Sequence, residues 1–424
     1  MAMINTQILE AGHKRWTRTG SVVSELIVLV LIIVAIVGAA AGEFLVTALC
    51  GLVLVLTIVS RIWARLALVD VDYQCLPSSD RLVEGDTIEL TLSIENRKPL
   101  PVPWLSVAEA LPEGLEHARD NRALRGFFKA PEIRDQASLG QYERVKFHHR
   151  LRAARRGHYA FGPTRIVSGD IFGFYEARLD SPRRPPSVVV YPRTVPLPDF
   201  DLPSRRPIGD SWSRSRLVDD PTRPSGLREY HSGDAARRID WKATARRGEV
   251  FVRTYDSSIA QRVVILAECN TSEEIWRTRP AILEAVVTGA ASVARRSVEL
   301  GYAVGIVSNG NIASELAPPM VAPGAGPDQL AALMTTLAGA GMLKTQPLED
   351  LLERYGPEAM PAGATVVFVA GLFRPATVGI VADLARRGHQ VVTLYVGDED
   401  PPEIPNLPVE DYRGVFAVPE NADA

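Results

Sequence analysis

Cysteine is scarce in this chain of 424 residues, with only Cys50, Cys75 and Cys269. Their spacing matches no metal-binding pattern and indicates no disulfide framework. An excess of positive charge is also lacking, because 47 Lys and Arg stand against 50 Asp and Glu, for a net charge of −3. This balance gives no electrostatic case for nucleic acid as a partner.

Familiar catalytic motifs are missing as well. The sequence has no phosphate-binding Gly-x-x-x-x-Gly-Lys loop, no Gly-x-Gly-x-x-Gly dinucleotide fingerprint, no Gly-x-Ser-x-Gly elbow and no His-Glu-x-x-His. The seven histidines do not cluster at the spacing of metal ligands. These absences disfavour an enzyme.

The length and the 46% share of apolar residues predict a folded, multidomain chain rather than a disordered one. The composition changes several times along the sequence, and each change suggests a boundary. We predict an N-terminal tail (1–20), two transmembrane helices (21–66), a β-sandwich (67–198), a linker (199–225), a charged block (226–258), an α/β domain (259–400) and a C-terminal tail (401–424).

Charged side chains nearly vanish between residues 21 and 60, where Glu25 and Glu43 are the only two. The uncharged stretches 26–42 and 44–60 reach the lower limit of a bilayer-spanning helix, and counting the first from Ser21 lengthens it. We therefore predict a helical hairpin that crosses the lipid bilayer twice. The alternative, a signal peptide followed by a buried helix, leaves the second stretch unexplained.

Basic residues flank this segment on both sides, with Lys14, Arg15 and Arg18 before it and Arg61 and Arg65 after it. Positive charge marks the cytoplasmic side of membrane helices, and a hairpin returns its two ends to one side. We expect a multi-pass protein of the cell (inner or plasma) membrane, with its larger part in the cytoplasm.

Alternation of apolar and polar residues begins after the hairpin. Ile88, Leu90, Leu92 and Ile94 share one face of an expected strand. Further short apolar runs, separated by Gly and Pro, are 104–108, 143–151, 158–161 and 187–191. They predict an antiparallel β-sandwich of immunoglobulin-like type. We interpret residues 155–163 and 168–174 as hairpin corners with a structural role.

Charge is densest between residues 226 and 258. Asp234 suits a helix N-cap, and the helix should run to Arg246 or Arg247 and end near Gly248. The candidate interaction residues are Arg228, Glu229, Tyr230, Gly233, Asp234, Arg237, Arg238, Asp240, Trp241, Lys242 and Arg246. They suggest a recognition surface, because guanidinium groups bind carboxylates and phosphates. An internal network of ion pairs and an enzymatic site around Asp234, Asp240 and His231 are the alternatives.

The block from Arg228 to Arg246 resembles the signature of the family called domain of unknown function 58. The segments 156–163 and 170–173 and the two-span N-terminus also match that family's layout. The resemblance implies a C-terminal domain similar to a von Willebrand factor A domain. It also implies a MoxR-type AAA+ ATPase as a partner, because family members are commonly encoded beside one.

Strands and helices alternate after residue 260. We expect strands over 262–268, 302–307, 365–370 and 390–396 and helices over 281–300, 329–338 and 378–387. This rhythm predicts a parallel sheet covered by helices on both faces, with any ligand at the carboxyl ends of the strands.

A von Willebrand factor A domain holds Mg²⁺ at those strand ends through Asp-x-Ser-x-Ser and later loops, and oxygen ligands suit this cation. The corresponding residues here are Glu268, Asn270 and Ser272, and no carboxylate stands in the segment 371–374. The preferred interpretation is therefore a von Willebrand factor A-like fold that no longer binds Mg²⁺. A metal-dependent ligand receptor through these three residues is the alternative.

The sequence thus favours a membrane-anchored cytoplasmic adaptor that works with a MoxR-type ATPase in the assembly or maturation of other proteins. A metal-dependent receptor and an enzyme with a site near Asp234 and Asp240 are the rival hypotheses.

Overall fold

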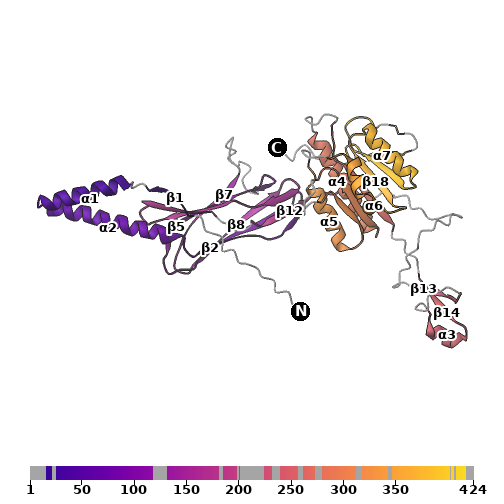
Figure 1. The fold of residues 1–424 in the computed structure, drawn as a ribbon, viewed down its shortest axis with the longest axis horizontal. Helices are drawn as coiled ribbons and strands as arrows, with labels where there is room; N and C mark the ends of the chain where they lie inside the picture. The colour runs from indigo at the N-terminus through magenta and orange to yellow at the C-terminus, as the bar shows by residue number, and fades with distance from the viewer. Residues whose placement is uncertain are drawn as a thin grey trace. The chain divides into compact units, whose positions relative to one another are not determined.

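The computed structural model describes residues 16–21, 25–117, 131–180, 185–197, 200, 224–231, 239–255, 261–272, 279–311, 318–341, 346–401, 403–404 and 407–416. These residues belong to two compact units, which divide between Arg193 and Thr194. The first unit contains the apolar helices and a strand-rich body, and the second contains the signature block and an α/β domain (Figure 1).

Two apolar helices pack against each other near the N-terminus. They are α1 (Glu25–Ala40) and α2 (Phe44–Ala67), joined through Gly42 in the left-handed region at φ 78°. Among the described residues, only α2 is long and apolar enough to cross a membrane. At 1.5 Å per residue, α1 reaches roughly 24 Å, against ~30 Å for the hydrocarbon core.

The prediction that the first span gains length from Ser21 is wrong. Ser21 belongs to the strand β1 (Trp16–Ser21), which pairs antiparallel with β11 (Tyr175–Asp180). Residues 16–20 are therefore part of a sheet and not of a tail. The chain leaves the strand-rich body at β1 and rejoins it at β2 (Val71–Pro77), so both ends of the helix pair are tied to the same body.

Three sheets build this body. Their orders are β1-β11-β10-β5-β7, β2-β4-β8-β6 and β3-β12-β9, and only β12 and β3 pair in parallel. The remaining strands are β3 (Arg81–Val83), β4 (Thr87–Asn96), β5 (Val102–Ala110), β6 (Leu115–His117), β7 (Glu132–Leu139), β8 (Arg144–Ala153), β9 (Gly157–Ala160), β10 (Thr164–Gly169) and β12 (Ser187–Tyr191).

One apolar core joins the three sheets. The alternation along β4 is confirmed, because Ile88, Leu90, Leu92 and Ile94 are all buried in it. The apolar runs that predicted strands in this region coincide with β5, β8, β9 and β12, apart from Glu143 and Phe161, which lie just outside β8 and β9. The body also ends earlier than residue 198, since Thr194 and the residues after it belong to the second unit.

A buried ammonium group connects α2 to the body. Lys98, in the loop between β4 and β5, donates from Nζ to the carbonyl oxygens of Ala67 at 2.7 Å and Val69 at 2.6 Å. These carbonyls lie at the end of α2, where backbone acceptors lack partners within the helix and the helix dipole favours a positive charge. The contact therefore fixes the end of α2 on the sheets.

A buried carboxyl group lies inside the body. Glu109 of β5 accepts hydrogen bonds at Oε2 from the hydroxyl groups of Tyr73, at 2.7 Å, and Thr164, at 2.5 Å. Burial raises the pKa of Glu109, although both hydroxyl groups favour its charged form. Burial, followed by the charge of Glu109, also raises the pKa of the Cys75 thiol to about 12, so this thiol stays protonated.

The second unit contains a six-stranded sheet in the order β17-β16-β15-β18-β19-β20. All neighbours pair in parallel except β17, which is antiparallel at one edge. The strands are β15 (Arg262–Glu268), β16 (Ala303–Ser308), β17 (Met320–Gly324), β18 (Thr365–Ala370), β19 (Gln390–Tyr395) and β20 (Val409–Asp411). The predicted parallel sheet is confirmed.

Helices cover both faces of this sheet, as predicted (Figure 1). One pair is α4 (Pro280–Glu299) and α5 (Pro327–Ala338), and the other is α6 (Leu348–Ala359) and α7 (Pro375–Arg386). The sequence analysis missed α6, β17 and β20. It also ended the domain too early, because β20 extends the sheet and Phe416 is fully buried beside Gly289 of α4.

We predict that Lys98→Met lowers the free energy of unfolding by about 1.5–3 kcal/mol, because two carbonyl oxygens lose a charged donor. Urea denaturation of the full chain in detergent, followed by circular dichroism, measures this change. Lys146→Met, at an exposed position on β8, is the control and should leave the midpoint unchanged. Equal midpoints for both variants would contradict the role of Lys98.

We also predict that Glu109 makes the body less stable as the pH rises. Between the ordinary carboxyl pKa, near 4.3, and the raised value in the folded state, the folded chain retains a proton that the unfolded chain has lost. The free energy of unfolding therefore falls through this window. Denaturation of Glu109→Gln at several pH values should show a weaker fall, whereas Glu116→Gln, at an exposed position, should follow the unaltered chain.

Candidate functional site

The signature block forms a small module of two strands and one helix. β13 (Pro224–Glu229) pairs antiparallel with β14 (Phe251–Tyr255), and the helix α3 (Trp241–Arg247) precedes β14. Within the module, Thr244 Oγ1 accepts a hydrogen bond from the backbone N–H of Phe251 at 3.1 Å. The guanidinium of Arg247 lies 5.2 Å from the centre of the Phe251 ring, a cation–π distance.

Asp240 begins α3. Its Oδ1 accepts from the backbone N–H groups of Lys242 and Ala243, each at 3.0 Å, and its Oδ2 accepts from Arg253 Nε at 2.8 Å. These hydrogen bonds, first that from Ala243 and then that from Arg253, hold the pKa of Asp240 below its usual value. The predicted helix from Asp234 through Arg247 is therefore wrong at residues 239 and 240, where the backbone is extended and Ile239 pairs with Val252. The predicted end at Gly248 is confirmed.

The structure gives the other candidate interaction residues different places. Arg228 and Glu229 end β13, Tyr230 follows them, and α3 carries Trp241, Lys242 and Arg246. Gly233, Asp234, Arg237 and Arg238 lie outside the described residues.

Large apolar side chains of this module face outward. Trp241 is 69% exposed, and Leu227, Tyr230 and Val250 are each at least 40% exposed. The basic side chains of Lys242, Arg246 and Arg247 are exposed on α3 as well. The module therefore presents aromatic and positively charged groups from a short helix that is held in place by its N-cap and by its contacts with β14.

The enzymatic hypothesis placed Asp234, Asp240 and His231 in one site, and Asp234 lies outside the described residues. Asp240 instead caps a helix and pairs with Arg253, and His231 Nδ1 lies 3.1 Å from the carbonyl oxygen of Glu229 and 3.2 Å from Arg228. Within the described residues, the side chain of Asp240 contacts Lys242, Ala243 and Arg253, and His231 is not among its partners. These two side chains therefore have structural partners rather than a shared cleft.

A second candidate site lies at the carboxyl ends of β15, β16 and β18. Glu268, the last residue of β15, is fully buried and accepts at Oε1 from Asn309 Nδ2 at 2.6 Å and from the backbone N–H of Asn270 at 3.1 Å. Asn309 also accepts the backbone N–H of Cys269 at 2.7 Å. Burial raises the pKa of Glu268, while Asn309 and then Arg374 oppose this shift.

Arg374 supplies the positive charge at this position. It is the N-cap residue of α7, and its terminal nitrogen lies 3.4 Å from both carboxylate oxygens of Glu268. When the amide of Asn270 is turned so that its oxygen faces Arg374, this oxygen accepts from both terminal nitrogens at 3.3 Å. Glu268 and Asn270 thus both face a guanidinium group.

This arrangement does not fit the divalent cation that the resemblance implies. Two of the three candidate ligands, Glu268 and Asn270, already surround a positive charge, and the loop after β18 contributes Arg374 where a cation site needs an oxygen ligand. Ser272 lies beyond the strand and is partly buried. Among the described residues, no three His, Cys, Asp or Glu side chains come together at a metal-binding distance.

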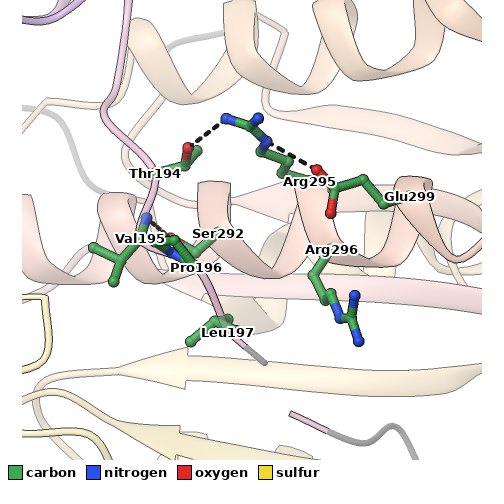
Figure 2. A pocket seen from close by; sticks show the side chains of 8 residues that line it. All are labelled: Thr194, Val195, Pro196, Leu197, Ser292, Arg295, Arg296 and Glu299. Carbon is green, nitrogen blue, oxygen red and sulfur yellow. Dashed lines mark hydrogen bonds and ion pairs between the residues drawn. The ribbon is translucent and has the colours of Figure 1, made fainter. Parts of the chain in front are cut away.

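A pocket of about 310 Å³ lies between residues 194–197 and α4 (Figure 2). Arg295 donates from Nη1 to Thr194 Oγ1 at 3.1 Å and from Nε to Glu299 at 3.0 Å, and the backbone N–H of Val195 donates to Ser292 Oγ at 2.9 Å. The polar groups that line the pocket therefore mostly fasten the segment 194–197 to α4. The lining includes one carboxylate, Glu299, and it is paired with Arg295.

Comparison with known proteins identifies the family. The sequence model of the family described as "Protein of unknown function DUF58" matches residues 226–413. Residues 226–413, somewhat under half of the chain, match the DUF58 family. The match includes the signature block and the α/β domain, so the predicted resemblance is confirmed there.

A Bacillus subtilis (strain 168) protein described as "Uncharacterized protein YeaD" is 23% identical to this chain over 225 residues. The match covers 51% of the chain and about half, 53%, of the Bacillus protein. Solved structures show weaker likeness. Part of Escherichia coli alpha-2-macroglobulin is 17% identical at a TM-score of 0.22, covering 29% of this chain and 23% of that one. A Listeria innocua beta-glucosidase is 10% identical at 0.15, covering 26% and 16%.

The matched region contains three contacts of charged side chains that the sequence did not predict. These are Arg253 with Asp240, Arg247 over Phe251, and Arg374 with Glu268. The first two join residues near each other in the sequence. The third had one signal, because the segment 371–374 follows a buried strand and offers a cation where the resemblance leads us to expect a carboxylate.

We predict that Arg374→Met lowers the free energy of unfolding of the DUF58 chain by about 3 kcal/mol, because a fully buried Glu268 loses its charged partner. Thermal unfolding of the second unit, followed by hydrogen exchange of β15 and β18, measures this loss. Arg387→Met removes the same charge from an exposed pair at the end of α7 and is the control. Equal effects of the two variants would show that Glu268 does not depend on Arg374.

Proposed function

We propose that this DUF58 chain is a membrane-anchored docking protein. In this proposal, α1 and α2 hold it in the bilayer, the strand-rich body and the α/β domain lie in the cytoplasm, and the signature block binds a partner protein. The proposed partner is a MoxR-type AAA+ ATPase, and the pair would act in the assembly or maturation of other proteins. The exposed Trp241, within a basic and rigidly held helix, carries the docking part of the proposal.

The membrane part is supported by α2 and by the strands on either side of the helix pair. α2 has 24 residues, and most of its large apolar side chains are exposed. Since β1 and β2 belong to one body, the helix pair returns the chain to the side from which it left. Arg61 and Arg65 lie toward the body end of α2, the side that positive charge marks as cytoplasmic. α1 would need local thinning of the bilayer to cross it fully.

The likeness to a von Willebrand factor A domain belongs to the same proposal. The sheet places its first three strands in the order β17-β16-β15 and continues with β18, β19 and β20, which is a doubly wound arrangement. We likewise propose an immunoglobulin-like relationship for the body, on the basis of its antiparallel sheets around one core. Both are folds on which recognition surfaces are common, so neither argues for catalysis.

The chemistry of the module indicates the kind of surface it would bind. Exposed Trp and Arg side chains dominate the energy of many protein interfaces, and a basic surface attracts an acidic one. Lys242, Arg246 and Arg247 follow Trp241 in the sequence of α3, whereas Asp240 is already paired. The proposed partner surface is therefore acidic and contains an apolar pocket. ATP hydrolysis would belong to the partner, since this sequence has no phosphate-binding loop.

We predict that Trp241→Ala weakens binding of the ATPase to the full chain in lipid nanodiscs by roughly 30-fold, the effect of removing an interface hot spot. Arg246→Glu/Arg247→Glu should weaken binding at low salt more than at high salt, because screening reduces the lost attraction. Biolayer interferometry at several salt concentrations measures both effects.

Arg386→Glu/Arg387→Glu is the matched control, because it makes the same change of charge at exposed positions at the end of α7. Unchanged affinity of a folded Trp241→Ala variant would remove α3 from the interface. Binding of the module to empty anionic nanodiscs, abolished by the same variants, would instead assign the surface to lipid.

A further inference from the structure

We propose that the end of the strand-rich body nearest the apolar helices carries a lipid-contacting rim, formed by Tyr142, Ile171 and Phe172. The rim would lie in the headgroup layer of the bilayer and hold the body at a fixed height and orientation. This inference rests on the membrane association proposed above and adds a second lipid contact from a different part of the chain.

The hydrogen bonds of the body place two of its turns beside the end of α2. Lys98 binds the last carbonyls of α2 through Nζ, and its own carbonyl oxygen accepts the backbone N–H of Tyr142 at 3.4 Å. Asn96 donates from Nδ2 to the carbonyl oxygen of Gly140 at 2.7 Å. The β4–β5 loop and the β7–β8 turn are thus joined to each other and to α2.

The β10–β11 turn lies at the same end. Its following residue, Tyr175, pairs with Ser21, the last residue of β1 before the helices, and α2 contacts both β10 and β11. Trp104, near the start of β5, donates from its indole nitrogen to the carbonyl oxygen of Asp170 at 3.0 Å. Three turns from different parts of the sequence therefore surround the place where the helices leave the sheets.

The side chains at these turns are unusually apolar for exposed positions. Tyr142 is 66% exposed, Ile171 is 60% exposed and Phe172 is 54% exposed. The Phe172 ring also stacks on Phe174, with ring centres 5.7 Å apart. An exposed aromatic group costs free energy in water, and Tyr and other aromatic residues gather where membrane proteins meet the lipid headgroups.

The β10–β11 turn is built to keep these side chains outward. Asp170 is 1% exposed, and its carboxylate accepts the backbone N–H groups of Phe172 at 3.0 Å and Tyr175 at 2.7 Å. Gly173 has φ of 73°, a conformation that other residues rarely adopt. The turn thus orders its backbone with a buried carboxylate while leaving Ile171 and Phe172 without a cover from the body.

Continuity with α2 identifies lipid as the occupant. The rim adjoins the apolar helices themselves, whereas the opposite end of the body does not. β8 runs from Arg144, next to Tyr142, to Ala153, whose carbonyl oxygen accepts the backbone N–H of Gly85. At ~3.3 Å per residue, these ends lie about 30 Å apart. Val83, exposed at the far end, therefore provides an internal comparison.

The test measures the depth of single labels in the full chain reconstituted in liposomes. Cys50, Cys75 and Cys269 are first replaced by Ala, and the melting temperature of this variant is checked against that of the unaltered chain. Nitroxide labels are then placed one at a time at Phe172→Cys, Tyr142→Cys, Val83→Cys and Leu52→Cys. The ratio of collisions with oxygen to collisions with a water-soluble nickel chelate is then compared. Leu52, an exposed residue of α2, reports on the membrane association itself.

We expect the ratio to be highest at Leu52, lowest at Val83 and intermediate at Tyr142 and Phe172. If Leu52 is in lipid while Tyr142 or Phe172 matches Val83, the rim is overturned and the membrane association stands. If the label at Leu52 gives the same ratio as the label at Val83, the proposed membrane association is wrong, and the proposed rim is wrong with it.

Discussion

The contact between Lys98 and the end of α2 is the constraint on which the first unit depends. An ammonium group buried in the body donates hydrogen bonds to carbonyl oxygens that the helix cannot pair internally, so helix and sheets cannot separate without exposing unpaired polar groups. The strands β1 and β2 add a second restraint, since they stand before and after the helix pair in the sequence and both belong to the body. An apolar hairpin that would otherwise be a flexible tether thus becomes a rigid extension of a folded body.

Local patterns predicted most of the regular structure. The alternation along β4 and the fully apolar runs of β15 and β18 identified their strands because each is buried on one or both faces. β17 and β20 were missed because they have weak patterns and owe their place to the rest of the sheet, whereas α6 does carry a helical pattern in Leu348, Leu351, Leu352 and Tyr355 that was overlooked. β1 was missed for a stronger reason: its partner, β11, lies far along the chain, and no local feature of residues 16–21 records that pairing.

In the candidate sites, too, local sequence predicted some features, while others depend on contacts between distant segments. Composition located the charged block, and the tryptophan and arginines of α3 do face outward. The role of Asp240 depended on where the helix begins, and that was decided by Arg253 and by the pairing of Ile239 with Val252, which are tertiary contacts. Three separate segments supply the residues at the strand ends, which are Glu268, Asn309 and Arg374. The hydrogen bond and the ion pair that join them form only because the parallel sheet brings the ends of these segments together.

The pairing of β1 with β11 has a consequence for biosynthesis. β1 emerges from the ribosome first, and the helices follow it, but Leu179, the partner of Trp16, is made only after nearly the whole strand-rich body. Until then β1 has an unsatisfied edge, and long-range pairing of this kind is slow and prone to error. The pairing edge of β1 therefore stays open while most of the strand-rich body is synthesised, and the sheet that contains β1 is completed only after residues 175–180 have been made.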